Sequence, residues 1–88
     1  MFKIELSRKA AKFYQKADNA TLKRLNLAFS KLSEDPFRHY HIKKLSGELE
    51  GSFRLRLGGL RIIYSVDDKR KIVYIEVIGF RGDVYKAW

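Results

Sequence analysis

The chain has 88 residues, of which 45% are hydrophobic and 14% aromatic, so we expect one small globular domain and exclude a disordered basic tail. It contains no cysteine, which excludes disulfides and thiolate metal sites, and no apolar run reaches the roughly 20 residues of a membrane span. The 19 Lys and Arg residues outnumber the 10 Asp and Glu residues and give a net charge of +9, which predicts a polyanionic partner: RNA, DNA or an acidic protein. The N-terminus has no signal-peptide pattern, so a cytoplasmic location is expected.

The first part of the chain predicts one strand followed by two helices. Apolar and polar residues alternate over Phe2–Leu6, which is typical of a short strand. Ser7 is a suitable N-cap for a helix over residues 8–17, and Asp18 or Asn19 would cap a second helix that runs to about residue 33. The second helix carries one apolar stripe, which consists of Leu22, Leu25, Phe29 and Leu32. Two amphipathic helices joined by a short turn predict an antiparallel pair.

Pro36 ends the second helix, because its ring cannot continue the helical hydrogen bonds. The segment over residues 35–51 is expected to be a loop, with a single helical turn at Ile42–Leu45. His39 and His41 lie in this loop with no third metal-ligand type at a suitable spacing. We interpret the two histidines as surface residues and not as a metal site.

The segment Ser52–Tyr64 predicts a β-hairpin. Two alternating stretches flank the pair Gly58-Gly59, and two glycines in that position are a strong signal for a tight turn with primed geometry. If Leu57 and Leu60 close the loop, the register follows for the remaining pairs, which are Arg56 with Arg61, Leu55 with Ile62, Arg54 with Ile63 and Phe53 with Tyr64.

The two faces of this hairpin differ, because side chains alternate along each strand. The apolar face, which we expect to join the core, consists of Phe53, Leu55, Leu57, Leu60, Ile62 and Tyr64. The other face carries Arg54, Arg56 and Arg61. Like charges directly opposite each other are destabilising, and an ordinary solvated face would mix lysine with glutamate. We therefore favour an anion-binding face over a solvated one.

The last predicted strand is Ile72–Phe80, which follows a charged turn. Its residues are apolar on both sides, with Val73, Ile75 and Val77 on one face and Tyr74, Glu76 and Ile78 on the other, so a central strand is expected. A lone buried carboxylate is costly, so Glu76 needs a partner, and the arginine-bearing face is the candidate. The complete order of elements predicts a single α+β domain over residues 1–88, with a two-helix hairpin packed on one face of a mostly antiparallel four-stranded sheet.

These elements resemble the RelE/ParE superfamily of toxins from toxin–antitoxin modules. The resemblance rests on the short first strand, the helix pair, the approach Leu45-Ser46-Gly47 to the sheet, the strand pair and the final run Gly79–Tyr85, which is similar to the C-terminal signature of the RelE branch. In that branch the toxin enters the ribosomal A site, where the ribose 2′-hydroxyl of the messenger RNA attacks the adjacent phosphate. The resemblance implies a ribosome-dependent, metal-independent endoribonuclease.

The resemblance also implies roles for individual residues. Arg61 and Arg81 would stabilise the phosphate in the transition state, because a guanidinium offers phosphate a planar pair of donors. Tyr85 would act as base or acid, with stacking on a nucleotide base as the other possible role. Arg54 and Arg56, where some relatives carry lysine, would bind RNA phosphates together with Lys43 and Lys44. Arginine does not give up its proton, so a second proton-transfer group would be one of Glu48, Glu50, Glu76, His39 and His41.

Two other functions remain open from the sequence. A ParE-like toxin shares the fold but binds and poisons DNA gyrase, which needs neither Tyr85 nor a phosphate-binding cage. A degenerate toxin would serve only as an antitoxin partner or corepressor. As a toxin, the chain is expected to bind a small acidic antitoxin that masks the arginine face or displaces residues 81–88, besides the ribosome and messenger RNA. No cofactor, metal, small-molecule ligand or membrane is expected.

Overall fold

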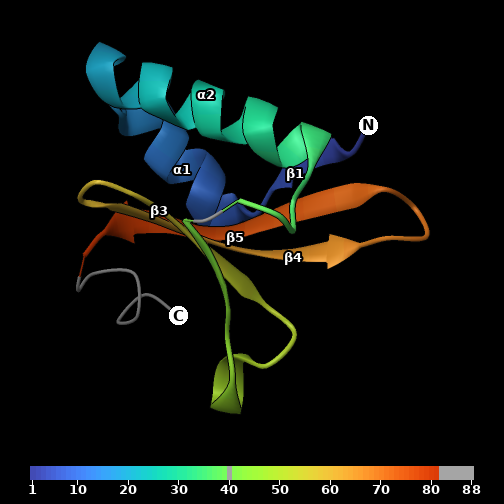
Figure 1. Cartoon of the computed structure of the whole chain (residues 1–88). Helices are drawn as coiled ribbons and strands as arrows, with labels where there is room; N and C mark the ends of the chain where they lie inside the picture. Colours follow the sequence, from blue (N-terminus) through green and yellow to red (C-terminus); the bar gives the residue numbers. More distant parts are fainter. Residues whose placement is uncertain (40, 82–88) are drawn as a thin grey trace.

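The computed structural model describes residues 1–39 and 41–81, without the side chain of Glu48, and has two layers. Both helices lie on one side of a single sheet (Figure 1). The elements are β1 (Lys3–Leu6), α1 (Arg8–Lys16), α2 (Asn19–Glu34), β2 (Ile42–Lys44), a short 3₁₀ helix η1 (Gly47–Leu49), β3 (Phe53–Leu57), β4 (Leu60–Asp67) and β5 (Ile72–Phe80). The strand order is β1-β5-β4-β3-β2, with β1 parallel to β5 and the other neighbours antiparallel.

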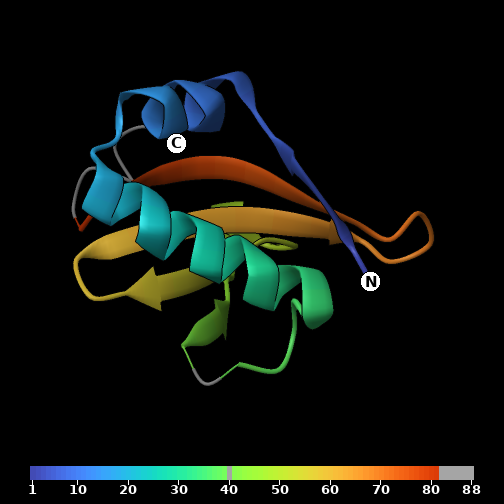
Figure 2. The same ribbon diagram turned by 90° about the horizontal axis from the view of Figure 1, so that it is seen from above.

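The two helices begin where the sequence predicts. The Ser7 hydroxyl accepts a hydrogen bond from the Ala10 N–H at 3.0 Å, and the Asp18 carboxylate accepts one from the Thr21 N–H at 2.8 Å. Each cap satisfies a backbone donor that the helix itself leaves unpaired. Seen from above, α1 lies at the β5 side of the sheet and α2 crosses its middle (Figure 2).

The β3–β4 hairpin has the predicted register in every pair, from Leu57 opposite Leu60 to Phe53 opposite Tyr64. Gly58, the first of the two loop residues, has a φ of 58°, which a type II′ turn requires and which residues with a Cβ rarely adopt. The rings of Phe53 and Tyr64 stack with their centroids 5.5 Å apart, as directly opposed aromatic residues on one face can.

The α+β fold is confirmed, but the sheet has five strands and not four. Residues Ile42–Lys44, predicted as part of a loop with one helical turn, form β2 along the outer edge of β3. Local sequence is a poor guide here, because the pairing of Ile42 with Leu55 depends on a strand edge that lies far along the chain. The added strand pairs backbone groups of β3 that an edge strand would leave to solvent.

The predicted faces of β5 are correct only in its first half. Val73 and Ile75 share one face as predicted, and this face lies toward the helices. The register between β4 and β5 then shifts between Ile63 and Tyr64, so that Glu76 is an extra residue in a β-bulge. A bulge reverses the alternation that follows it. As a result Ile78 faces the helices, whereas Val77 lies on the opposite face.

Two apolar clusters follow from this arrangement. The main cluster lies between the helices and the sheet, and its fully buried members include Ala10, Leu25, Ala28, Leu60, Ile62, Tyr64, Val73 and Ile75. A smaller cluster lies on the uncovered face, where Ile63 and Val77 pack with Leu45. In the described part of the chain, no helix is both long and apolar enough to cross a membrane.

Candidate functional site

The uncovered face of the sheet gathers the predicted arginines. We call Arg54, Arg56, Arg61 and Arg81 the arginine face. Arg56 and Arg61 lie directly opposite each other on β3 and β4, and Arg54 lies opposite Ile63 in the small apolar cluster. Described residues therefore place several guanidinium groups around an apolar centre, which is an arrangement suited to an anion.

Arg61 is the most buried member of the arginine face. It is only 9% exposed, and its Nη1 donates hydrogen bonds to the carbonyl oxygens of Gly58 at 2.6 Å and Leu60 at 3.0 Å. These carbonyls belong to the hairpin turn and its neighbour, so the turn geometry orients the guanidinium. Two hairpin carbonyls thereby partly offset the repulsion between Arg61 and the opposing Arg56.

Arg54 has a buried side-chain donor that makes no hydrogen bond within the described residues. Its side chain is half-buried, and its Nε is buried with no hydrogen-bond partner among the described residues. Leaving a buried donor unpaired costs on the order of 1–3 kcal/mol, and such a group in a folded protein asks for an explanation. An anion bound on the arginine face would supply the missing acceptor.

Arg81 lies beside the hairpin turn, because its backbone N–H donates to the Gly59 carbonyl at 2.9 Å and so extends the β4–β5 pairing by one residue. Its side chain is exposed. Tyr85, the remaining predicted catalytic residue, lies outside the described residues. The structure therefore brings Arg54, Arg56, Arg61 and Arg81 to one part of the sheet, and the role of Tyr85 stays a prediction.

The two predicted phosphate-binding lysines lie on different faces. Lys43 is opposite Arg54 in the β2–β3 register and extends the positive charge of the arginine face. Lys44 is opposite Phe53, whose side chain packs against the main cluster, so Lys44 lies on the other face. The pair was expected in a loop. Lys43 and Lys44 instead lie in a strand, where successive side chains point to opposite faces of the sheet.

Glu76 does not pair with an arginine, contrary to the expectation from the sequence. Its carboxylate accepts a hydrogen bond at 3.1 Å from the hydroxyl of Ser52, which is 7% exposed, and within the described ranges it forms no ion pair. The Glu76 backbone carbonyl accepts a second bond, at 2.6 Å, from the Ser7 hydroxyl that caps α1. The bulge is thus tied to both layers of the protein.

The two histidines lie close together at the start of β2. Their ring centroids are 5.3 Å apart, and Nδ1 of His39 accepts the backbone N–H of His41 at 3.3 Å. No group of three or more His, Asp or Glu side chains that could hold a metal ion occurs among the described residues.

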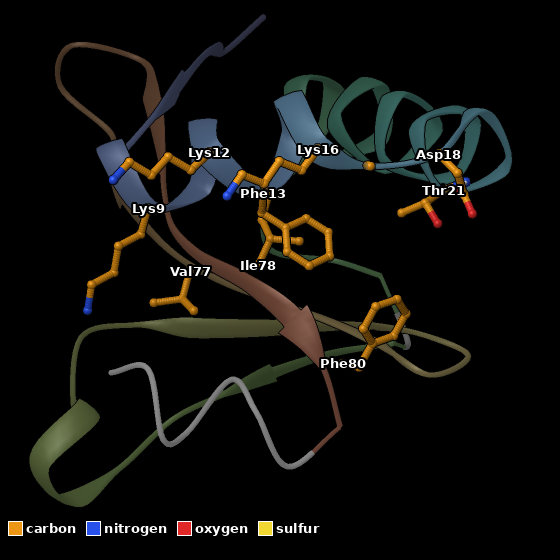
Figure 3. Close-up of a pocket in the computed structure, with 10 residues that line it drawn as sticks. Lys9, Lys12, Phe13, Lys16, Asp18, Thr21, Val77, Ile78 and Phe80 are labelled. Atoms are coloured by element: carbon orange, nitrogen blue, oxygen red, sulfur yellow. The ribbon is translucent and has the colours of Figure 1, made fainter.

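A second surface feature, the α1–β5 groove, has a volume of about 560 Å³. Its floor includes Phe13, Ile78 and Phe80, and its rim carries Lys9, Lys12 and Lys16 of α1 (Figure 3). The rings of Phe13 and Phe80 lie 5.9 Å apart, and Phe80 is 47% exposed. The groove exists because β1 pairs with β5 only as far as Ile75, so α1 and not a strand borders the rest of β5.

One candidate functional residue, Arg24, is not marked by any sequence pattern. Arg24 on α2 donates a hydrogen bond through Nη2 to the Leu57 carbonyl in the hairpin, so α2 brings a further guanidinium next to the turn. Read alone, Arg24 is one of many basic residues on the solvated side of a helix. The pair Gly58-Gly59 is the only local signal that something approaches the turn closely.

Comparison with known proteins gives consistent similarities over most of the chain. The sequence model described as the ParE toxin of the type II toxin–antitoxin system parDE matches residues 4–85. Toxin RelG of Mycobacterium tuberculosis is 37% identical over 62 residues, which cover 70% of this chain and 69% of RelG.

Solved structures with the same fold come from bacteria and archaea. A chain of the toxin–antitoxin complex RelBE2 of Mycobacterium tuberculosis superposes with a TM-score of 0.79 and 28% identity, and the match covers 91% of this chain and 98% of that one. A chain of the RelE–RelB complex of Pyrococcus horikoshii gives a TM-score of 0.76 and 29% identity, with coverage of 92% and 96%.

Proposed function

Because the chain belongs to the RelE/ParE superfamily of toxins from type II toxin–antitoxin systems, we propose that it is an endoribonuclease that cleaves messenger RNA in the ribosomal A site. The observation that carries this proposal is the arginine face. Several guanidinium groups converge around one region of the sheet, and Arg54 has a buried Nε without an acceptor. A scissile phosphate flanked by further phosphates would provide acceptors for these donors.

The proposed reaction needs three things from the protein: stabilisation of the pentacoordinate phosphate, removal of the 2′-hydroxyl proton and protonation of the leaving 5′-oxygen. Arg61 and Arg81 supply the first, with Arg61 held in place by the hairpin carbonyls. Tyr85 supplies one of the two proton-transfer groups, and the other is one of the candidates from the sequence, which are Glu48, Glu50, Glu76, His39 and His41. Arg54, Arg56 and Lys43 bind the phosphates on either side, and the ribosome holds the RNA in line for attack.

The test is translation in vitro of a defined message with purified toxin, with cleavage sites mapped by primer extension. We expect ribosome-dependent cuts that fall roughly a hundredfold in Arg81→Ala and in Tyr85→Phe, the scale typical of lost charge stabilisation and of lost acid–base groups. Arg70→Ala is the matched control, because Arg70 is an exposed arginine in the β4–β5 turn that pairs with Asp67. Its activity should equal that of the wild type.

The second candidate function is poisoning of DNA gyrase, which the description of the matching ParE sequence model favours. An intact message with unaffected translation would overturn the nuclease proposal. Inhibition of gyrase supercoiling by the same preparation, unchanged in Tyr85→Phe, would then establish the alternative.

We also propose that a cognate antitoxin inhibits the protein in the cytoplasm, since the similar RelBE2 and RelE–RelB structures are toxin–antitoxin complexes. The α1–β5 groove suits an antitoxin segment with apolar side chains between acidic ones, because its floor is apolar and its rim carries lysines. Lys12→Glu should weaken the complex about tenfold in a titration with the antitoxin, whereas Lys69→Glu, in the exposed β4–β5 turn, should not. Equal affinities in both variants would place the antitoxin elsewhere.

A further inference from the structure

A second cavity, of about 240 Å³, lies between α2 and the C-terminal end of β3, beyond the last β2–β3 pair, Ile42 with Leu55. We call it the hairpin-edge pocket, and its lining residues are Arg24, Leu27, His41, Arg56, Leu57 and Gly58. At this end the Arg56 N–H of β3 donates a hydrogen bond, at 3.1 Å, to the carbonyl of His41, the residue before β2. Beyond that bond the edge of β3 opens into the pocket.

Gly58 has no side chain, which leaves space for the Arg24 guanidinium that lines this pocket. A Cβ on Gly58 would lie 2.6 Å from Nη2 of Arg24, a distance that real Cβ atoms essentially never show. The same nitrogen donates to the Leu57 carbonyl. Gly58 therefore serves two purposes: it adopts the positive φ of the turn and it lets the guanidinium of Arg24 lie against the hairpin.

The hairpin-edge pocket is cationic, with an apolar floor. Arg24 and Arg56 contribute two guanidinium groups, no carboxylate lines the pocket, and neither arginine is ion-paired within the described ranges. Leu27 and Leu57 contribute apolar surface, and Leu27 is 59% exposed, so part of its side chain is accessible to a ligand in the pocket.

His41 adds an aromatic ring that is uncharged at neutral pH. Partial burial lowers its pKa from the ordinary value of 6.5, and the positive charges of His39, Arg56 and Lys31 lower it further. A neutral imidazole can stack on a flat ring and can also exchange hydrogen bonds with it.

This combination of groups matches a nucleotide. Guanidinium groups bind phosphate in a forked geometry, and both guanidinium and imidazole planes stack on nucleobases. Leucine side chains contact the edge or face of a base. A free inorganic anion would bind the arginines but would not contact the apolar surface that Leu27 and Leu57 provide.

The pocket is continuous with the arginine face through one residue. Arg56 lines the pocket and also lies directly opposite Arg61. We propose that the hairpin-edge pocket binds one unstacked nucleotide of the RNA, adjacent to the segment held on the arginine face, and that it discriminates between bases. The proposal rests on the proposed RNA-cleaving function for its ligand, and it adds a determinant of sequence preference that the phosphate-binding arginines cannot provide, because phosphates are the same in every nucleotide.

The first experiment uses the free protein and the four nucleoside 5′-monophosphates. The imidazole C–H signals of His41, assigned with His41→Gln, are followed by NMR during titration with each nucleotide and with inorganic phosphate. We expect saturable shifts that differ among the four nucleotides, and affinity at least about tenfold lower in Leu27→Trp, which fills the pocket from an exposed position. Lys23→Ala, the removal of a neighbouring exposed charge on α2, is the control and should bind as the wild type does.

Two results would overturn the proposal: no shift of His41 with any nucleotide at millimolar concentration, or equal shifts with all four nucleotides and with phosphate alone. The second experiment maps ribosome-dependent cleavage of a message with randomised codons. Leu27→Trp should alter the base preference at one position beside the cut. If the wild type cuts nothing, the nuclease proposal fails, while the nucleotide titration still decides whether the pocket binds a base.

Discussion

The two faces of β4 differ in composition and in function. On the face toward the helices, Leu60, Ile62 and Tyr64 are fully buried in the main cluster. On the other face, the Arg61 guanidinium donates hydrogen bonds to hairpin carbonyls. Ile63, the next residue on that face, packs in the small cluster with Val77. The covered face follows the rules of a protein core, whereas the open face combines a small apolar support with several positive charges.

Because side chains alternate between the two faces of a strand, residues that stabilise the fold and residues that bind a ligand can be neighbours in the sequence. Charges that face each other without acids among them weaken a fold, so their presence on the open face is a cost that the large cluster on the covered face offsets. Substitutions on the covered face should therefore act on folding, and substitutions on the arginine face should act on ligand binding.

The largest effect is expected for Ile62→Ala, which leaves a cavity in the main cluster. It should lower the free energy of unfolding by about 2–5 kcal/mol, measured by urea denaturation. Leu27→Ala, at a residue that is 59% exposed, is the control and should change stability little. A loss below about 1 kcal/mol for Ile62→Ala would mean that the covered face is not the main source of stability.

Tyr64→Phe should come next. The Tyr64 hydroxyl donates to the Pro36 carbonyl at 2.7 Å and ties the end of α2 to the sheet, so the variant leaves a buried acceptor unpaired at a cost of about 1–3 kcal/mol. Burial, followed by the charge of Asp35, also raises the pKa of Tyr64 well above its ordinary value of 10.0.

The raised pKa gives this prediction a pH signature. Above about pH 10 the unfolded chain loses the Tyr64 proton while the native protein keeps it, so stability falls by up to about 1.4 kcal/mol for each further pH unit. Tyr64→Phe should remove that part of the decline in urea titrations at successive alkaline pH values. Tyr74→Phe, at a residue that is 41% exposed, should leave the decline unchanged.

Ser7→Ala should have a moderate effect, because it removes both the N-cap of α1 and the hydrogen bond to the bulge at Glu76. We expect a loss of about 1–2 kcal/mol. Ser7→Asp separates the two contributions, since it keeps the cap acceptor but has no hydroxyl to donate to the Glu76 carbonyl. If Ser7→Asp is as stable as the wild type, the tie to the bulge contributes nothing.

The smallest effect on folding is expected for Arg56→Ala. Its stability should lie within about 0.5 kcal/mol of the wild type, because the side chain is exposed and opposes another arginine. Its binding to short RNA should fall in a filter-binding or anisotropy titration, with a smaller dependence on salt. A destabilisation comparable to that of Ile62→Ala would show that the two faces are not separable.

Much of the architecture can be predicted from the sequence because its causes are local. Ser7 and Asp18 cap the helices through side chains a few residues away from the donors they satisfy. Gly58 sets the turn, and the turn sets every pair of the β3–β4 hairpin. Strand alternation then places Arg54, Arg56 and Arg61 on one face, and the arginine face was predicted for that reason.

The remainder depends on contacts between distant segments. β2 forms only because β3 offers an edge, and that strand moves Lys44 to the other face of the sheet. The bulge at Glu76 is held by Ser7, which is 69 positions away in the sequence, and by Ser52, which is 24 positions away, so no local pattern predicts it. Arg24 reaches the hairpin from α2 across 33 positions of sequence. By itself the sequence determined the helix starts, the hairpin and the side of the sheet that carries charge. The tertiary structure alone decided which further groups meet there, because such meetings depend on packing between segments that are remote along the chain.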